Sequence, residues 1–169
     1  MKKIARHDCA AALLLMFGVA WLSPHALAQS TPTRYEQTDP SVTYTAGWSQ
    51  DSSRSWSAGT AAVSTTPGAQ ATFTFSGPSV NWIGGRGPWS GIARVSVDGA
   101  FVAEVDTYSS EEIRVPMFTV NGLTNASHTL TIEVTGQMNA AATSNYVVVD
   151  AFDVPGPAVS RLQETDPAV

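Results

Sequence analysis

The chain has 169 residues and a formal net charge of −5, with fourteen Asp and Glu residues against nine Lys and Arg residues. After residue 28 it holds six arginines, no lysine and thirteen carboxylates, a formal charge of −7. A chain with this balance lacks the basic surface that nucleic acids and anionic membranes require, so we exclude both as partners.

The first residues have the pattern of a secretory signal peptide. Three basic residues precede an apolar run from Cys9 to Leu22, and Ala26-Leu27-Ala28 offers the small-x-small pattern of a cleavage site. The run is shorter than the roughly 20 residues that span a bilayer. We therefore expect residues 1–28 to be removed and the protein to be secreted, extracellular or at the cell surface. Cys9 is the only cysteine, so the mature chain would contain no disulfide.

Short alternating apolar patterns, separated by turn residues, fill the rest of the chain. Alternation is clear over residues 71–75, 93–97 and 130–134, whereas no window shows a helical stripe. Asp98-Gly99 lies between two such segments and predicts a type I′ hairpin. Residues 146–154 are apolar on both parities, as expected for a closing strand that is covered on both faces. The pattern predicts an all-β, antiparallel β-sandwich (jelly roll) of about eight strands over residues 34–154, flanked by linkers at 29–33 and 155–160.

The chain ends on a partial repeat of its own module. Residues 161–169 (RLQETDPAV) match residues 34–42 (RYEQTDPSV) at the Arg, Thr, Asp, Pro and Val positions, 127 residues apart. This period is the length of a domain. We expect 161–169 to be the truncated start of a second module, so that neighbouring modules of the same chain are partners. Tandem modules favour multivalent attachment over catalysis.

Four segments carry a resemblance to a known superfamily. They are residues 84–91 (GGRGPWSG), 93–99 (ARVSVDG), 122–136 (GLTNASHTLTIEVTG) and 147–154 (VVVDAFDV). Together they resemble the galactose-binding-like jelly-roll domains, which are similar to carbohydrate-binding modules, of secreted bacterial multi-modular proteins. The resemblance covers residues 34–154. It implies a non-catalytic carbohydrate-binding module with a polysaccharide or glycan as partner. Similar domains also act as adhesive or spacer sandwiches that engage protein or only position their neighbours.

Aromatic residues are the candidates for sugar binding, because the C–H faces of sugars stack on aromatic rings. Trp89 lies in a loop rich in Gly and Pro, beside Arg86, whose planar guanidinium can donate several hydrogen bonds to a sugar. Trp48 and Trp56 bracket a polar run, and Tyr108 is the fifth candidate.

Each of these candidates also has a structural interpretation. Arg86 could clamp its own loop, and Trp48 and Trp56 could anchor loop ends on the core. Trp82 belongs to an apolar strand and is expected in the core. The glycines in this segment are expected to serve special backbone angles; they are Gly84, Gly85, Gly87 and Gly91.

The resemblance also implies a structural calcium ion held where the first and last strands meet. The candidate ligands are carboxylates at the two ends of the module: Glu36, Asp39, Asp150 and Asp153. Alternatively, Asp150 pairs with an arginine or caps backbone N–H groups, and Asp39-Pro40 forms a turn. One histidine and no cysteine after the leader exclude a transition-metal site.

Few residues are suited to catalysis. His128 is the single histidine after the leader and is expected to be structural. Two carboxylate pairs, Glu111-Glu112 and Glu104 with Asp106, are interpreted as solvated charges. We therefore predict that the module is not an enzyme and keep a small hydrolase as the third hypothesis.

Overall fold

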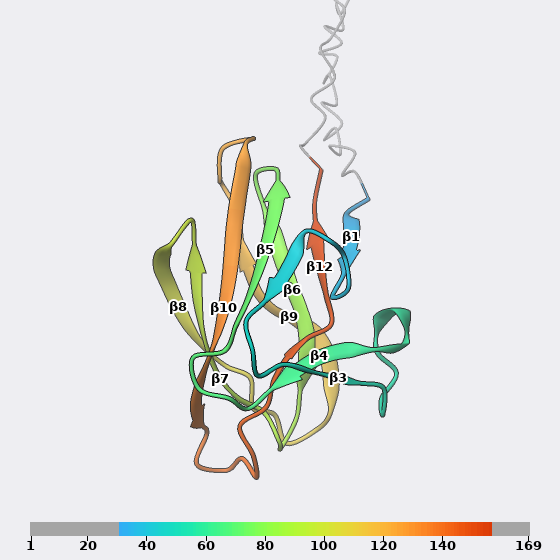
Figure 1. Cartoon of the computed structure of the whole chain (residues 1–169), viewed down its shortest axis with the longest axis vertical. Coiled ribbons are helices and arrows are strands. Elements are labelled where there is room, and N and C mark those ends of the chain that lie inside the picture. The colour runs from blue at the N-terminus through green and yellow to red at the C-terminus, as the bar shows by residue number, and fades with distance from the viewer. Residues whose placement is uncertain (1–30, 157–169) are drawn as a thin grey trace, which may run out of the picture.

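The computed structural model describes residues 31–156 (Figure 1). The expected leader and the expected second copy lie outside the described residues, as does most of the linker 155–160. Within the described range, no helix has the length and apolar character needed to cross a bilayer. The elements, in chain order, are β1 (Thr33–Glu36), β2 (Val42–Tyr44), β3 (Ser49–Asp51), the 3-10 turn η1 (Ser57–Gly59), β4 (Ala61–Ser64), β5 (Gln70–Ser76), β6 (Val80–Arg86), β7 (Gly91–Val97), β8 (Ala100–Asp106), β9 (Ile113–Val120), β10 (Ser127–Met138), β11 (Val147–Val149) and β12 (Ala151–Val154).

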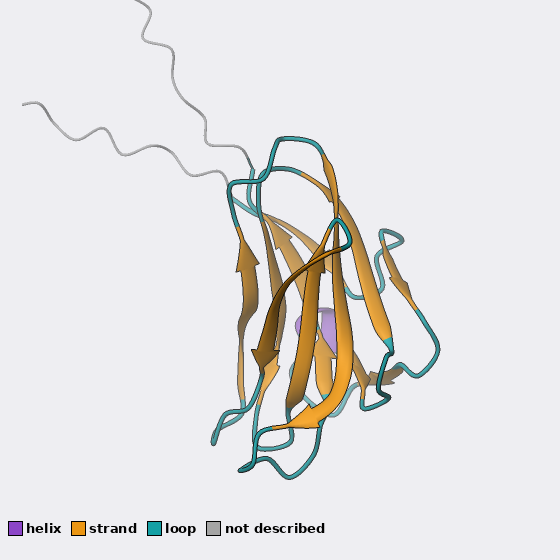
Figure 2. Ribbon diagram, turned by 90° about the vertical axis from the view of Figure 1, so that its left-hand side faces the viewer, coloured by secondary structure: helices purple, strands orange, loops and turns teal. Residues whose placement is uncertain are grey.

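These strands form three antiparallel sheets. The five-stranded sheet has the order β2-β5-β10-β7-β8 and the four-stranded sheet has the order β1-β12-β6-β9. Buried residues of both sheets belong to one hydrophobic cluster, and the two layers are visible from the side in Figure 2. A small third sheet, β11-β4-β3, lies beside them. The predicted all-β, antiparallel sandwich is confirmed.

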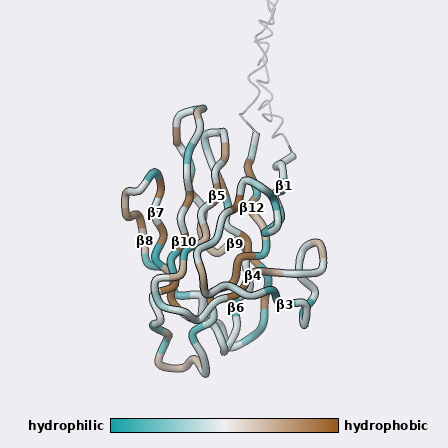
Figure 3. The backbone as a smooth tube through the Cα atoms, viewed as in Figure 1, coloured by the Kyte–Doolittle hydropathy of each residue, from teal (hydrophilic) through white to brown (hydrophobic). Residues whose placement is uncertain are grey.

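The core follows the alternation of the sequence. Along β10 the buried residues are every second one from His128 to Val134, and Phe73 of β5 stacks on Phe152 of β12 with the ring centroids 4.4 Å apart. Trp82 is fully buried, as predicted. Short apolar patches accordingly occur on several strands of the sandwich (Figure 3).

The closing segment differs from the prediction of a single strand. Its residues are buried on both parities, as expected, but β11 pairs with β4 in the small sheet, whereas β12 pairs with β6 and β1. The fully buried Asp150 separates the two strands. The predicted closing strand is therefore two short strands, and the described residues form twelve strands where the sequence predicted about eight.

Of two predictions about backbone conformation, the one for the Asp98-Gly99 turn is confirmed and the one for the glycines around Trp89 is wrong. Asp98 and Gly99 both have positive φ, 50° and 78°, between β7 and β8, as a type I′ turn requires. By contrast, none of the four glycines around Trp89 has positive φ, so the expectation of special backbone angles is wrong there. These residues are small because other groups come close: a Cβ built on Gly85 would lie 2.7 Å from the Trp56 ring, and one on Gly87 would lie 2.6 Å from the Trp89 ring.

Candidate functional site

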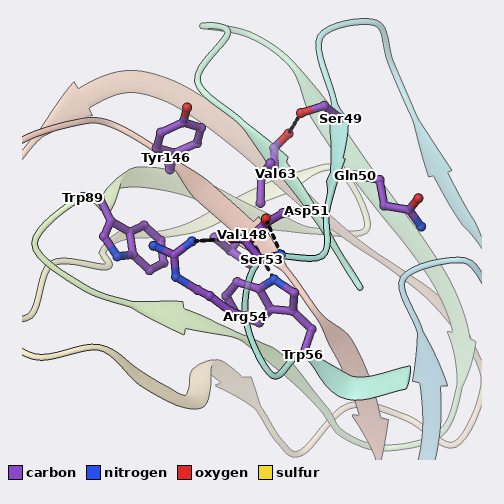
Figure 4. A pocket seen from close by; sticks show the side chains of 10 residues that line it. All are labelled: Ser49, Gln50, Asp51, Ser53, Arg54, Trp56, Val63, Trp89, Tyr146 and Val148. Carbon is purple, nitrogen blue, oxygen red and sulfur yellow. Dashed lines mark hydrogen bonds and ion pairs between the residues drawn. The ribbon is translucent and has the colours of Figure 1, made fainter. Parts of the chain in front are cut away.

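A hollow of about 410 Å³ opens between the small sheet and the loops around Arg54 and Trp89 (Figure 4). Its volume falls within the range of small-molecule sites. The lining comes from segments far apart in sequence, namely β3 and the loop after it, the β6–β7 loop, and the residues around β11. The lining residues are Ser49, Gln50, Asp51, Ser53, Arg54, Trp56, Val63, Trp89, Tyr146 and Val148.

Trp56 forms the apolar base of this hollow. Only 7% of its surface is exposed, and it packs with Ala61 and Val148 in a cluster separate from the main core. Its indole N–H donates to Asp51 Oδ2 at 2.9 Å, so the ring is fixed by both packing and a hydrogen bond. The position of Trp56 is compatible with both interpretations made from the sequence, because the ring anchors its loop and also faces the hollow.

Trp89 forms one wall and is held by charged neighbours. The guanidinium of Arg54 lies over its ring, 4.5 Å from the centroid (Figure 4), a cation–π contact. The Trp89 indole N–H donates to Glu112 Oε1 at 2.6 Å, and Arg54 donates to both oxygens of Glu112 at 3.0 and 3.1 Å. Hydrogen bonds from Arg54 and Trp89 lower the pKa of the Glu112 carboxyl, so this carboxylate stays ionised at neutral pH.

Tyr146, the residue directly before β11, also lines the hollow. Its side chain is 41% exposed, and in Figure 4 it stands near Trp89 with its hydroxyl pointing outward. An exposed ring beside a half-buried one offers two aromatic surfaces to a sugar. Because the Tyr146 ring packs little against the rest of the protein, a ligand can contact it without disturbing the fold.

The other predicted site residues lie apart from this hollow. Arg86 lines a second, smaller hollow of about 120 Å³ that shares Arg54, Trp56 and Trp89, and it donates to the carbonyl of Asp106 at 3.0 Å. Trp48 packs with Tyr44, 5.4 Å between centroids, and lines a third hollow of about 270 Å³. Tyr108 lines none of these three hollows. The structure thus brings Trp89 and Trp56 together with Arg86 nearby, whereas Trp48 and Tyr108 do not line the larger hollow, although Tyr108 forms a β-bridge with Gly87.

Sequence reasoning missed three lining residues of the hollow, Asp51, Arg54 and Tyr146, and also Glu112, which lines the smaller neighbouring hollow. Glu112 was interpreted as a solvated charge, but it is bound by Arg54 and Trp89. Asp51 and Arg54 lie within the polar run between Trp48 and Trp56, so the run itself was the available signal. No local signal pairs Glu112 with that run, because the two are 58 residues apart.

Each of the four carboxylates predicted to hold calcium has a hydrogen-bond partner within the protein. Asp39 caps the turn at Ser41, with Oδ1 accepting from the backbone N–H at 2.9 Å, and Asp153 forms a bidentate pair with Arg34 at 2.7 Å. In residues 31–156, no group of three or more His, Cys, Asp or Glu side chains could hold a metal ion. Calcium binding by these four carboxylates stays a prediction.

Glu36 and Asp150 remain close to each other through Ser57. Asp150 Oδ1 accepts the backbone N–H of Ser57 at 2.8 Å, and Glu36 Oε1 accepts its hydroxyl at 2.7 Å. One buried oxygen of each carboxylate has no hydrogen-bond partner. Arg114 lies 3.7 Å from Asp150. Burial raises the pKa of Asp150. The alternative interpretation, an Asp150 that caps a backbone N–H beside an arginine, describes this arrangement.

We expect the melting temperature to be the same in millimolar calcium and in excess chelator. Glu36 and Asp150 each offer one buried oxygen without a hydrogen bond, whereas Ca²⁺ takes six to eight oxygen ligands, and Arg114 already supplies positive charge beside Asp150. Differential scanning calorimetry in the two buffers tests this. An ion bound at a hundredfold excess over its dissociation constant would add roughly 2.7 kcal/mol. A calcium-dependent rise of several degrees would therefore contradict the expectation.

His128 has a structural environment. Its Nδ1 lies 2.7 Å from Asp98 Oδ2, Nε2 lies 3.0 Å from the Thr124 carbonyl oxygen, and the ring packs against Phe75. The hydrogen bond with Asp98 raises the pKa of His128. These contacts fix the turn between β7 and β8 to the start of β10, and none of them is with a residue that lines the hollow.

Comparison with known proteins finds similarity to parts of much longer chains. No family model matches the chain. It is 35% identical over 94 residues to a protein of Flavonifractor plautii named A type blood N-acetyl-alpha-D-galactosamine deacetylase, a match that covers 56% of this chain and 12% of the relative. It is 33% identical over 100 residues to the A type blood alpha-D-galactosamine galactosaminidase of the same organism, covering 59% of this chain and 9% of the relative. The chain therefore spans about a tenth of the curated relatives it matches.

Solved structures with similar folds show the same architecture. A two-domain esterase active on acetylated mannans aligns with a TM-score of 0.57 at 15% identity, covering 83% of this chain and 41% of that chain. A Paenibacillus xanthan lyase aligns with a TM-score of 0.56 at 16% identity over 76% of this chain and 14% of that chain. The Podospora anserina GH26-CBM35 mannanase has a TM-score of 0.53 at 16% identity, covering 78% and 29%. At these identities the likeness supports the fold.

Proposed function

We propose that this chain is a non-catalytic carbohydrate-binding module of a secreted, tandem-repeat protein, and that the hollow between Trp56, Trp89 and Tyr146 binds the glycan. The observation that carries the proposal is the hollow itself, in which three aromatic side chains surround a small set of polar groups. This is the composition of a sugar site, because rings receive the apolar faces of the sugar and polar side chains receive its hydroxyls.

The comparisons support the same class of ligand. Both curated relatives are named for action on galactosamine or N-acetylgalactosamine, and similar folds occur in proteins named for xanthan and mannans. The match covers only 12% and 9% of the two relatives, which is the share expected of an accessory module within a long enzyme. We therefore assign binding, rather than the relatives' named activities, to this module.

A catalytic role has little support among the described residues. His128 is engaged by Asp98 and Thr124. Glu104 and Asp106 lie on the exposed edge strand β8. Glu112 is bound by Arg54 and Trp89, which holds its pKa low, whereas the general acid of a glycosidase needs a raised pKa.

We expect Tyr146→Ala to weaken glycan binding about 3- to 10-fold without changing the melting temperature. The ring is exposed and therefore contributes little to the fold, while an aromatic contact contributes roughly 0.5–1.5 kcal/mol beyond the area it buries. Affinity electrophoresis against a panel of soluble polysaccharides measures the retention. Tyr108→Ala, which removes a tyrosine outside the hollow, is the matched control and should be retained like the unmodified protein.

The adhesive or spacer alternative predicts a different result. A module that only positions its neighbours would show no retardation by any polysaccharide in the panel, and Tyr146→Ala would then have no phenotype. A panel that includes galactosamine- and mannose-containing polymers covers the chemistry named for the relatives. Absence of retention across that panel would overturn the proposed function.

A further inference from the structure

A positive charge that belongs to the protein lies where the larger hollow meets the smaller one, because Arg54 lines both of them. The guanidinium of Arg54 contacts the Trp89 ring, both oxygens of Glu112, and Asp51 Oδ2 at 3.5 Å. One cation is thus surrounded by an aromatic face and two carboxylates. Such a set of groups is selective for cations, because the ring quadrupole and both carboxylates attract positive charge.

A sugar that stacks on Trp89 has to displace this guanidinium. Arg54 covers one face of the ring, and a Cβ built on Gly87 would lie 2.6 Å from ring atoms, so the Gly87 side has no room for a ligand. Once Arg54 has moved, Glu112 and Asp51 lose the cation that they share. A neutral sugar leaves both carboxylates without a counter-charge, and an acidic sugar would be repelled by them.

We propose that the hollow selects sugars with a free amino group, whose ammonium takes the place of the Arg54 guanidinium between Trp89, Glu112 and Asp51. This inference rests on the proposed function, because it specifies the ligand of the same site. The ammonium restores the charge balance of the two carboxylates, and Trp56 and Tyr146 receive the rest of the sugar ring. The negative net charge of the chain, −5, also attracts a cationic polymer from solution.

Arg54 is then an internal competitor of the ligand. In the free protein its guanidinium keeps Trp89, Glu112 and Asp51 in the positions that they would have around a bound ammonium group. When the guanidinium moves away, the Trp89 ring becomes accessible. The side chain is 35% exposed, so it can swing into solvent without rearrangement of the core.

The test compares free and N-acetylated forms of the same sugars, because acetylation removes the charge and keeps the ring. The probes are a glucosamine hexamer, a galactosamine oligomer and their N-acetylated forms, with isothermal titration calorimetry at pH 6 as the measurement. We expect the free-amine form of one pair to bind at least about tenfold more tightly than its acetylated form. Equal binding of the two forms would overturn this inference and leave the proposed function intact. Failure of every sugar in this set and in the polysaccharide panel would count against both.

Two pairs of variants separate the charge from the fold. Glu112→Gln keeps an acceptor for the Trp89 indole but removes the charge. It should lower affinity for the free-amine probe about tenfold and should not lower affinity for the acetylated probe, which then leaves one fewer carboxylate without a counter-charge. Glu111→Gln makes the same charge change on the neighbouring exposed residue and should have no effect. Arg54→Met keeps an apolar stem and should raise free-amine affinity several-fold, whereas Arg86→Met should not. Loss of affinity in Arg54→Met would show that Arg54 is itself a ligand contact and would overturn the competitor role.

A last probe tests whether the sugar ring is required. Tetralysine carries ammonium groups without a sugar, and we expect it to bind at least about tenfold more weakly than the free-amine oligomer, because it cannot stack on Trp56 and Tyr146. Equal affinity for tetralysine would identify a site for basic peptides and would overturn the assignment to amino sugars.

Discussion

Trp89→Ala should abolish measurable retention by the glycan ligand while leaving the domain folded. The ring is the wall of the hollow and the anchor for both Arg54 and Glu112, so its removal eliminates the stacking surface and releases the polar groups. At protein interfaces a few residues carry most of the binding energy, and tryptophan is enriched among them. Affinity electrophoresis and calorimetric titration measure the loss.

The same change should destabilise the fold by about 1–2 kcal/mol, less than the roughly 3–5 kcal/mol expected for a core tryptophan. Trp89 is half-buried and packs against Gly85 and Gly87, so its loss removes contacts without opening a cavity in the main core. Trp89→Phe is the control that keeps a ring, and it should retain part of the binding. Normal glycan binding by Trp89→Ala would show that this hollow is not the binding site.

Trp82→Ala should have the largest effect on stability, a loss of roughly 3–5 kcal/mol. The side chain is fully buried in the main core, and its indole N–H donates to the carbonyl of Val148 at 3.0 Å. Truncation therefore leaves both a cavity and an unpaired carbonyl. Urea unfolding at equilibrium gives the free energy of unfolding for each variant.

Trp82→Phe helps to distinguish the two contributions, because it keeps an aromatic ring in the core, with a smaller cavity than Trp82→Ala, and still loses the donor. We expect a loss of about 1–2 kcal/mol for this variant. Val148 is also part of the floor of the hollow, so both Trp82 variants should weaken glycan binding slightly. A loss below about 1 kcal/mol for Trp82→Ala would show that the Val148 segment is not held by the core in this way.

The parts of the fold that depend on local chemistry could be predicted from the sequence. The alternation of Leu130, Ile132 and Val134 identified a half-buried strand, and Asp98-Gly99 identified a hairpin. The break at Asp150 could not be predicted, because the apolar run continues on both sides of it and only the pairing with two different sheets separates β11 from β12. The positions of Gly85 and Gly87 gave a signal of a special environment, but its cause is the proximity of two tryptophans, which is a tertiary feature.

Only those parts of the candidate site that depend on local sequence could be predicted. The loop that carries Trp89 and Arg86 was identified by composition, and Trp56 by its place beside a polar run. The residues that define the chemistry of the hollow come together only in the folded chain, since Arg54 and Glu112 are 58 residues apart and belong to different loops. Residue type alone does not reveal such partners either. Asp39 and Asp153 are suitable calcium ligands by type, but in the folded chain Asp39 accepts a hydrogen bond from Ser41 and Asp153 accepts one from Arg34.

The most direct test of the central claim is nitrogen–proton correlation NMR of the tryptophan indole groups during titration with the best-retained glycan. Trp48, Trp56, Trp82 and Trp89 each give one indole signal, and they lie in four different environments. We predict that the Trp89 and Trp56 signals shift with ligand concentration and that those of Trp48 and Trp82 do not. Shifts confined to Trp48, or no shift of any indole signal while the glycan is bound, would contradict the assignment of the hollow as the binding site.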